Sequence, residues 1–187
     1  MGHKAIAIPV VMQHGKPPRY CLVRDRRFRD WTFVTGGCRK REIENPIRCA
    51  LRELCEETRG AIRLFEGQYM SYSFNIKLDD SPELHTYNVF IFLVDFNSVQ
   101  KECIVSSFDD HKRKTEERKR QGMSIRLVQD ENDILTWTSL DNILTNFKLW
   151  EVADVVANSD IIKRINSGDE NLPWLRFGRD VVYGDKV

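Results

Sequence analysis

The chain has 187 residues, 41% hydrophobic and 30% charged, which suits one compact domain with its own core. Its 29 basic and 28 acidic side chains give a net charge of +1, which excludes a protein that coats nucleic acid by bulk charge alone. The five cysteines have no paired CxxC spacing, so the sequence favours a reducing compartment over a disulfide framework or zinc knuckle. No stretch approaches the roughly 18 apolar residues of a membrane span, so we expect a soluble cytoplasmic protein without membrane contact.

The first predicted element is a β-hairpin. Residues 4–12 are largely apolar and rich in β-branched side chains, residues 14–18 contain a Gly-Lys-Pro-Pro turn signal, and residues 20–23 form a second apolar run. A brief strand is expected at 31–34, and the glycines at 36–37 let the backbone approach another group closely. The loop between these strands is basic and carries Arg24, Arg26, Arg27 and Arg29.

A helix is predicted from Asn45 to Arg59. Asparagine is a preferred N-cap, Pro46 suits the first helical position, and Gly60 is a natural stop. The helical repeat places an apolar stripe beside a polar face, so the helix can bury one side and present the other to a cleft. The stripe consists of Ile47, Leu51, Leu54 and Thr58.

Three glutamates of this helix are predicted to share one face. Glu53, Glu56 and Glu57 stand at i, i+3 and i+4, which are neighbouring positions on a helix surface. A solvated acidic face is one interpretation, because glutamate is a strong helix former. A bound cation explains three mutually repelling charges better, and Mg²⁺ or Mn²⁺ takes oxygen ligands while keeping positions for water or phosphate. The spacing therefore favours a divalent metal site.

The later elements indicate the fold class. Alternating residues over 71–78 predict a strand with one buried face, and residues 89–94 are apolar on both faces, as in a central strand covered on both sides. We therefore expect an α/β/α sandwich with a mixed central sheet. The remaining predictions are a helix at about 107–121, strands at 124–128 and 134–137, and helices within 139–166.

The domain is expected to span residues 1–166. Residues 167–187 are predicted to form a loosely organised C-terminal tail, with Trp174, Leu175 and Phe177 docking back on the core.

The segment around the acidic helix resembles the Nudix box. The pattern of that family is Gly, five residues, Glu, seven residues, then Arg-Glu-aliphatic-x-Glu-Glu-x-Gly-aliphatic, and this chain matches every defined position from Glu44 through Glu57. Two positions depart from it: six residues separate Gly37 from Glu44, and Arg59 stands where the pattern has glycine. Both lie at the ends of the helix, where a one-residue insertion costs little. The resemblance implies a Nudix-type fold and a pyrophosphohydrolase.

The resemblance also implies roles for individual residues. Arg52 would orient the glutamates, Glu44 would support them, and Glu53 would be central to catalysis. The metal ion would neutralise a diphosphate and activate an attacking water. The implied ligands are Glu53, Glu56, Glu57 and the carbonyl of Gly37.

A general base and phosphate-binding side chains are expected as well. In this family the base is a box glutamate or an acid shortly before the last strand, and Glu131 is our preferred candidate there, with Asp130 and Asp133 as alternatives. That polar run can equally be an ordinary turn. The phosphates would be held by Arg24, Arg26, Arg27 and Arg29, because guanidinium groups bind phosphate bidentately, unless these arginines are solvated surface charges.

The Nudix pattern identifies the bond, within a nucleoside diphosphate linked to X, and leaves X open. The basic stretch 111–120 is predicted to contact an RNA backbone, although Glu116 and Glu117 interrupt it and a solvated helix is the alternative. Together with the flanking strands it loosely resembles viral mRNA-decapping Nudix proteins, which would make X an RNA 5′ end. Aromatic candidates for stacking on a cap are Phe33, Tyr72, Phe74 and Trp137, each of which can instead be core.

Other substrates of the family remain open from the sequence. They are dinucleoside polyphosphates, nucleotide sugars, dNTPs and diphosphoinositol polyphosphates. A Nudix-fold binding module without activity would be expected to have lost its acids, and all of them are present here.

Overall fold

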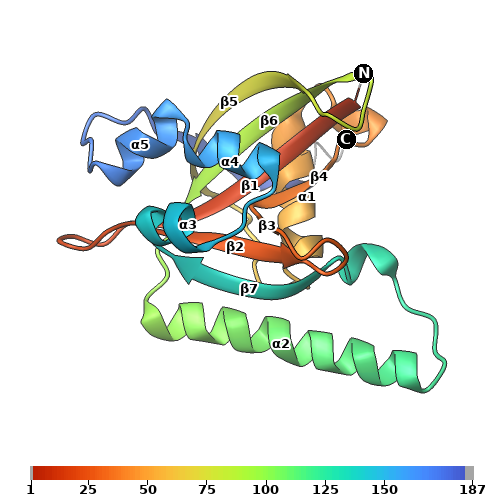
Figure 1. Ribbon diagram of the computed structural model, residues 1–187. Coiled ribbons are helices and arrows are strands. Elements are labelled where there is room, and N and C mark those ends of the chain that lie inside the picture. Colours follow the sequence, from red (N-terminus) through yellow and green to blue (C-terminus); the bar gives the residue numbers. More distant parts are fainter. Residues whose placement is uncertain (1, 184–187) are drawn as a thin grey trace.

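The computed structural model describes residues 2–183 and contains one mixed sheet of eight strands (Figure 1). The main path of the sheet is β3-β2-β1-β6-β5-β8, with β4 paired to β1 and β7 paired to β2. β1 and β6 are parallel, and the other pairs are antiparallel. The strands are β1 (Gly2–Val11), β2 (Arg19–Asp25), β3 (Trp31–Thr32), β4 (Val34–Gly37), β5 (Gly67–Lys77), β6 (Leu84–Leu93), β7 (Asn132–Thr138) and β8 (Leu175–Phe177).

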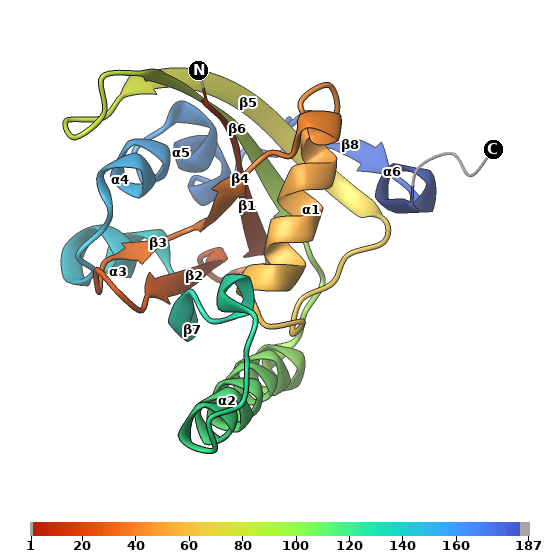
Figure 2. The same cartoon turned by 90° about the vertical axis from the view of Figure 1, so that its right-hand side faces the viewer.

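Helices cover both faces of this sheet, which confirms the predicted α/β/α sandwich (Figure 2). One core lies under α3 (Leu140–Asn146), α4 (Glu151–Ala157) and α5 (Asp160–Asn166). The opposite core lies under α1 (Pro46–Glu57) and α2 (Ser98–Arg120). The short elements are η1 (Lys40–Glu42), η2 (Leu127–Gln129) and α6 (Arg179–Tyr183). None of the helices in residues 2–183 is long and apolar enough to cross a membrane.

β1 is the strand that positions the glycines next to α1. Its side chains alternate between the two cores, with Ile6 and Ile8 on one side and Ala5 and Ala7 on the other. Its first half pairs with β4, so that Ala5 faces Gly36 across the ladder, and its last residues pair with β2. β6 lies between β1 and β5 as the predicted central strand.

α1 begins and ends close to the predicted bounds. Its whole predicted stripe, Ile47, Leu51, Leu54 and Thr58, is buried. Asn45 occupies the N-cap position, although its side chain forms no capping hydrogen bond there. At the other end Arg59 and Gly60 both have positive φ, 57° and 76°, and the Gly60 N–H donates to the Cys55 carbonyl at 2.8 Å. This left-handed turn stops the helix.

α2 starts at Ser98, nine residues before the predicted bound at 107. A reciprocal capping box explains the earlier start, because the Asn97 side chain accepts from the Gln100 N–H at 2.8 Å and the Gln100 side chain accepts from the Asn97 N–H at 2.9 Å. The helix runs along the β7 edge of the sheet (Figure 1). Its inward contacts with the core come from Ile104 and Phe108, both buried.

The predicted strand at 124–128 is wrong. Residues 123–126 form a loop and Leu127–Gln129 a 3₁₀ turn, with Leu127 76% exposed and Val128 50% exposed. Apolar side chains suggested a strand here, but they do not face a core.

The segment after residue 166 contains regular structure. β8 pairs antiparallel with β5, and α6 follows it. Phe177 is buried and Trp174 packs on the core, as predicted, whereas Leu175 is 55% exposed and does not dock. Leu175 and Phe177 lie two apart in the strand with an unlike fate because β8 is short and at the sheet edge.

Candidate functional site

The carboxylate of Glu53 lies directly against the backbone of Gly36. A Cβ atom at position 36 would stand 1.9 Å from the carboxyl carbon of Glu53, so only glycine fits there. β4 carries this glycine, and its ladder with β1 holds it opposite α1. The predicted close approach of the double glycine is therefore confirmed, and the group that approaches is the first glutamate of the acidic face.

Arg52 connects the acids of α1 to the preceding loop. Its Nη1 donates to Glu53 at 2.7 Å and to Glu56 at 3.1 Å, and its Nη2 donates to the Gly37 carbonyl at 2.9 Å. Its Nε and Nη2 also donate to the two oxygens of Glu42, at 2.8 and 2.9 Å. Five hydrogen bonds thus fix one guanidinium, and they place Arg52 in the orienting position that the resemblance implied.

Glu42, and not Glu44, makes the contact with Arg52. Glu42 is buried and also accepts from the Arg39 N–H at 2.8 Å, whereas Glu44 is exposed. Burial pushes the pKa of Glu42 up, but hydrogen bonds from Arg52 and Arg39 outweigh it and lower the pKa to about 2. The signal was present in the sequence, because Gly36, five residues and Glu42 fit the first part of the box, and the insertion then falls between Glu42 and Arg52.

Glu42→Gln and Glu44→Gln form a matched pair that tests this assignment. We expect Glu42→Gln to lower diphosphate hydrolysis by at least about tenfold, since losing a charge-assisted contact of roughly 1.5–3 kcal/mol releases Arg52 and the glutamates it orients. Glu44→Gln should leave the rate unchanged. Steady-state kinetics on both variants check this, and a loss in Glu44→Gln alone would restore the original assignment.

Glu57 is the most deeply placed acid of the site. It is buried, and Asn132 Nδ2 donates to its Oε2 at 3.0 Å. Burial raises its pKa well above the ordinary range, and the charges of Glu53 and Glu131 add to the effect. Burial likewise raises the pKa of Glu53 and of Glu131. The structure therefore brings Glu131 to the same acidic site as the box glutamates.

A cleft of about 440 Å³ opens beside these acids. Gly36, Glu57 and Glu131 line one part of it, and Phe28 and Trp150 line another. The acidic residues in its lining outnumber the basic ones, with Asp25, Asp30, Glu57, Asp80, Glu131 and Glu151 against Lys4. A polyanionic substrate would be repelled from such a cleft unless cations accompany it.

The acids fit a divalent metal ion. Within residues 2–183 no three Asp, Glu, His or Cys side chains gather as a ready metal cage, because Arg52 draws Glu53 and Glu56 while Asn132 holds Glu57. Mg²⁺ needs only one or two carboxylates when waters and substrate phosphates complete its octahedron. The raised pKa values of Glu53 and Glu57 show that neighbouring negative charges oppose one another, which a cation would relieve.

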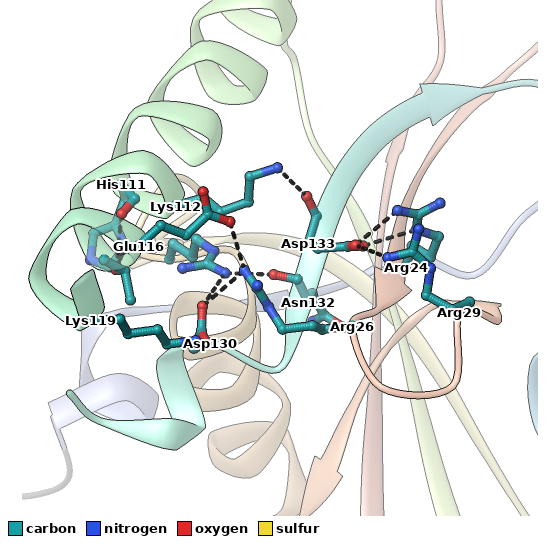
Figure 3. Close-up of polar contacts among 12 residues, drawn as sticks. Arg24, Arg26, Arg29, His111, Lys112, Glu116, Lys119, Asp130, Asn132 and Asp133 are labelled. Carbon is teal, nitrogen blue, oxygen red and sulfur yellow. Dashed lines mark hydrogen bonds and ion pairs between the residues drawn. The ribbon is translucent and has the colours of Figure 1, made fainter. Parts of the chain in front are cut away.

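Residues 130–133 form the segment that presents Glu131 to the cleft, and cations from three other elements hold it (Figure 3). Asp130 accepts from Arg59 at 2.8 Å and pairs with Arg26 at 3.2 Å and with Lys119 of α2. The Arg26 N–H donates to the Glu131 carbonyl at 2.8 Å. We call this segment the 130–133 loop.

Asp133 anchors the other end of the 130–133 loop. Arg24 donates to both of its carboxylate oxygens, at 2.9 and 2.8 Å, Arg29 donates at 3.0 Å, and Lys112 donates to its carbonyl at 3.1 Å. Three of the four arginines predicted to hold phosphates are thus engaged with Asp130 or Asp133, and Arg27 stacks over Phe28 at 5.0 Å. In this structure the arginines position the loop.

Arg59 is a buried arginine that the sequence showed only as a departure from the box. Its Nη2 donates to Asp130 and, at 2.7 Å, to the Asn132 carbonyl, and its guanidinium lies 5.1 Å over the ring of Phe108. It therefore joins the end of α1 to the 130–133 loop and to α2. Nothing in the box pattern predicts this contact, because the pattern places glycine there.

The aromatic side chains of the cleft differ from the predicted set. Phe33 is buried in the core, Tyr72 stacks with Phe74 at 6.2 Å, and Trp137 meets Phe96 edge to face at 6.0 Å. The cleft is instead lined by Phe28 and Trp150, which the sequence did not single out.

Comparisons with known proteins agree with this geometry. The family model of the NUDIX domain matches residues 1–151. No curated protein matches the chain. Among solved structures, a Nudix hydrolase from M. smegmatis, RenU, has a TM-score of 0.57 at 11% identity and covers 91% of this chain and 88% of its own.

Two further structures share the fold. A Nudix hydrolase from Listeria monocytogenes has a TM-score of 0.56 at 15% identity, over 90% of this chain and 97% of its own. The NUDIX domain of Shewanella oneidensis NrtR, solved with ADP-ribose, has a TM-score of 0.53 at 13% identity, over 83% of this chain and 82% of its own.

Proposed function

Because this chain belongs to the NUDIX family and is a hydrolase of pyrophosphate bonds, we propose that it uses Mg²⁺ or Mn²⁺ to cleave a nucleoside diphosphate linked to X, with the 5′ end of RNA as X. The observation that carries the proposal is the acidic cleft beside Glu53, Glu57 and Glu131, next to a helix whose C-terminal half is basic.

The residues of the site divide the work between them. Glu53, Glu56 and Glu57 would hold the metal ion, which neutralises the diphosphate and lowers the pKa of the attacking water. Arg52 keeps Glu53 and Glu56 in place, and Gly36 leaves room for the Glu53 carboxylate. Glu131 is the proposed general base, because it lines the cleft and its raised pKa suits it to accept a proton.

The outer part of the cleft supports a capped 5′ end. Phe28 and Trp150 offer aromatic faces there, and Asp30, Asp80 and Glu151 add negative charge. A methylated guanine carries a positive charge, so it gains both from stacking on an aromatic ring and from nearby carboxylates. An uncharged base gains only from the stacking.

RNA beyond the cap would meet α2. Lys112 and Lys119 are committed to Asp133 and Asp130, so the predicted contact through residues 111–120 reduces to the side chains that face away from the body. Small nucleotides are the second candidate, since the Shewanella oneidensis domain of the same fold was solved with ADP-ribose and the cleft has room for a nucleotide.

Assays of purified protein against capped RNA and a panel of small substrates test the proposal. The panel contains ADP-ribose, dinucleoside polyphosphates, dNTPs and diphosphoinositol polyphosphates. We expect release of the capping nucleotide from RNA in Mg²⁺ or Mn²⁺, detected by ion-exchange chromatography, and complete loss in EDTA without unfolding by circular dichroism. Turnover of small substrates alone would replace RNA as X, and EDTA-resistant turnover would exclude the metal.

A further inference from the structure

The positive charge of this protein is concentrated in one segment. Residues 111–126 carry seven lysines and arginines and two glutamates, a net charge of +5, although the whole chain has +1. The rest of the molecule is therefore net negative, as the cleft is. We call residues 111–126, the C-terminal half of α2 and the loop after it, the basic segment.

Most cations of the basic segment are already paired with protein acids. Lys112 and Lys119 bind the 130–133 loop, Arg113 and Lys114 pair with Asp110, and Arg120 pairs with Glu117 at 2.8 Å. Arg118 and Arg126 enter no ion pair with any residue of the described range 2–183. Two exposed guanidinium groups are thus free to take an anion from outside.

Both free arginines line the same hollow. It has a volume of about 130 Å³ and lies between one face of α2 and the following loop, with His111, Lys114, Thr115, Arg118, Ile125 and Arg126 around it. At roughly 30 Å³ per water molecule it holds about four waters, which is ample for a phosphate group. Burial, followed by the charges of Arg59, Arg118 and Lys114, lowers the pKa of His111, as expected beside a positive surface.

We propose that this hollow binds a backbone phosphate of RNA, through Arg118 and Arg126 with Lys114 beside them. The proposal rests on the proposed function and adds a second contact to it. The hollow shares no residue with the cleft, so a small nucleotide in the cleft gains nothing from it, whereas a chain of phosphates can occupy both. Guanidinium groups bind phosphate bidentately, which suits two arginines at one site.

The surroundings of the hollow favour a nucleic acid over a free anion. Met123, Leu127 and Val128 follow along the same loop and are 52%, 76% and 50% exposed. Exposed apolar side chains beside cations can be covered by the bases of a bound strand, whereas inorganic phosphate would leave them in water. Lys119 links α2 to Asp130, next to Glu131, so the basic segment lies close to the loop that lines the cleft.

The test compares two double variants that remove the same charge from the same segment. Arg118→Gln with Arg126→Gln empties the hollow of its free cations, whereas Arg113→Gln with Arg120→Gln removes cations that Asp110 and Glu117 already neutralise. Binding of a short fluorescently labelled single-stranded RNA is measured by anisotropy over a range of salt concentrations, in EDTA so that nothing is cleaved. All the substituted side chains are exposed, and melting temperatures confirm that both variants fold.

We expect the first double variant to bind RNA roughly tenfold more weakly at physiological salt, with a slope of log K against log salt reduced by about 1.4, or about 0.7 for each phosphate charge lost. The control should keep the wild-type slope. Equal losses in both variants would show diffuse attraction by α2, and no loss in the first would exclude the hollow; either result overturns the proposal.

The outcome is separate from that of the proposed function. If the wild type binds RNA through Arg118 and Arg126 but releases no capping nucleotide in Mg²⁺, the hollow stands and RNA 5′-end hydrolysis falls. If the wild type cleaves capped RNA while the first double variant keeps full affinity, the hollow falls and the hydrolysis stands.

Discussion

Replacing Glu57 with glutamine is expected to lower kcat for diphosphate hydrolysis by roughly 100- to 10,000-fold, the range seen when a group that acts directly on the proton or charge of the reaction is lost. Glutamine keeps the size of the side chain and an oxygen that can accept from Asn132 Nδ2, so only the charge is removed. The measurement is steady-state turnover in saturating Mg²⁺.

The fold should survive this change. Glu57 is buried beside the charges of Glu53 and Glu131, so its neutral replacement relieves repulsion, and the melting temperature should stay equal or rise. Glu66→Gln, in the exposed loop after α1, is the control and should retain full activity. A Glu57→Gln enzyme with near wild-type turnover would show that this carboxylate does not hold the metal.

Replacing Asp130 with asparagine is expected to destabilise the protein by about 3 kcal/mol, because it breaks a buried ion pair and leaves the Arg59 guanidinium uncompensated. Arg26 and Lys119 lose their carboxylate at the same time. Since Asp130 precedes Glu131, kcat should fall as well. Urea unfolding followed by circular dichroism measures the loss of stability.

Acidification provides an internal check on this prediction. Burial raises the pKa of Asp130, but hydrogen bonds from Lys119 and Arg59 outweigh it, so its pKa is lowered in the folded protein. A lowered pKa contributes stability above the ordinary aspartate value of about 3.9 and loses it as the pH falls through the folded value. The gap between wild type and Asp130→Asn should therefore narrow below pH 4, and a constant gap would mean that the charge is not responsible.

A surface ion pair serves as the matched control. Asp110 pairs with Arg113 and Lys114 on the exposed side of α2, and Asp110→Asn should leave the unfolding midpoint unchanged. In the double variant Asp130→Asn with Arg59→Met, part of the lost stability should return, because no buried charge is left without a partner.

The sequence predicted the parts of this fold that depend on local patterns. The stripe from Ile47 to Thr58 and the two-sided apolar run of β6 each indicate a periodicity that the structure retains. The strand at 124–128 failed because apolar composition does not reveal whether a segment has a sheet neighbour. The N-terminal part of α2 was missed because its start depends on the capping residues Asn97 and Gln100.

The candidate site was predictable where the box fixes the spacing, and less so where chain segments far apart meet. Arg52 lies where the resemblance implied, while the insertion before it moved the supporting glutamate from position 44 to 42. The pairing of Arg24 and Arg29 with Asp133 joins residues more than a hundred positions apart, and no local pattern encodes it. The clustering of arginines was visible in the sequence, but their engagement by protein carboxylates was not.

The left-handed Arg59 constrains the order in which this part of the chain can evolve. Glycine at position 59 would relieve the positive φ of 57° and leave Asp130 with Arg26 and Lys119 as partners. Loss of Asp130 first would instead strand a buried guanidinium. A lineage can therefore return to the family's glycine by changing Arg59 and only afterwards Asp130, whereas the reverse path passes through an unstable intermediate. Arg59 is entrenched by the aspartate that it joined.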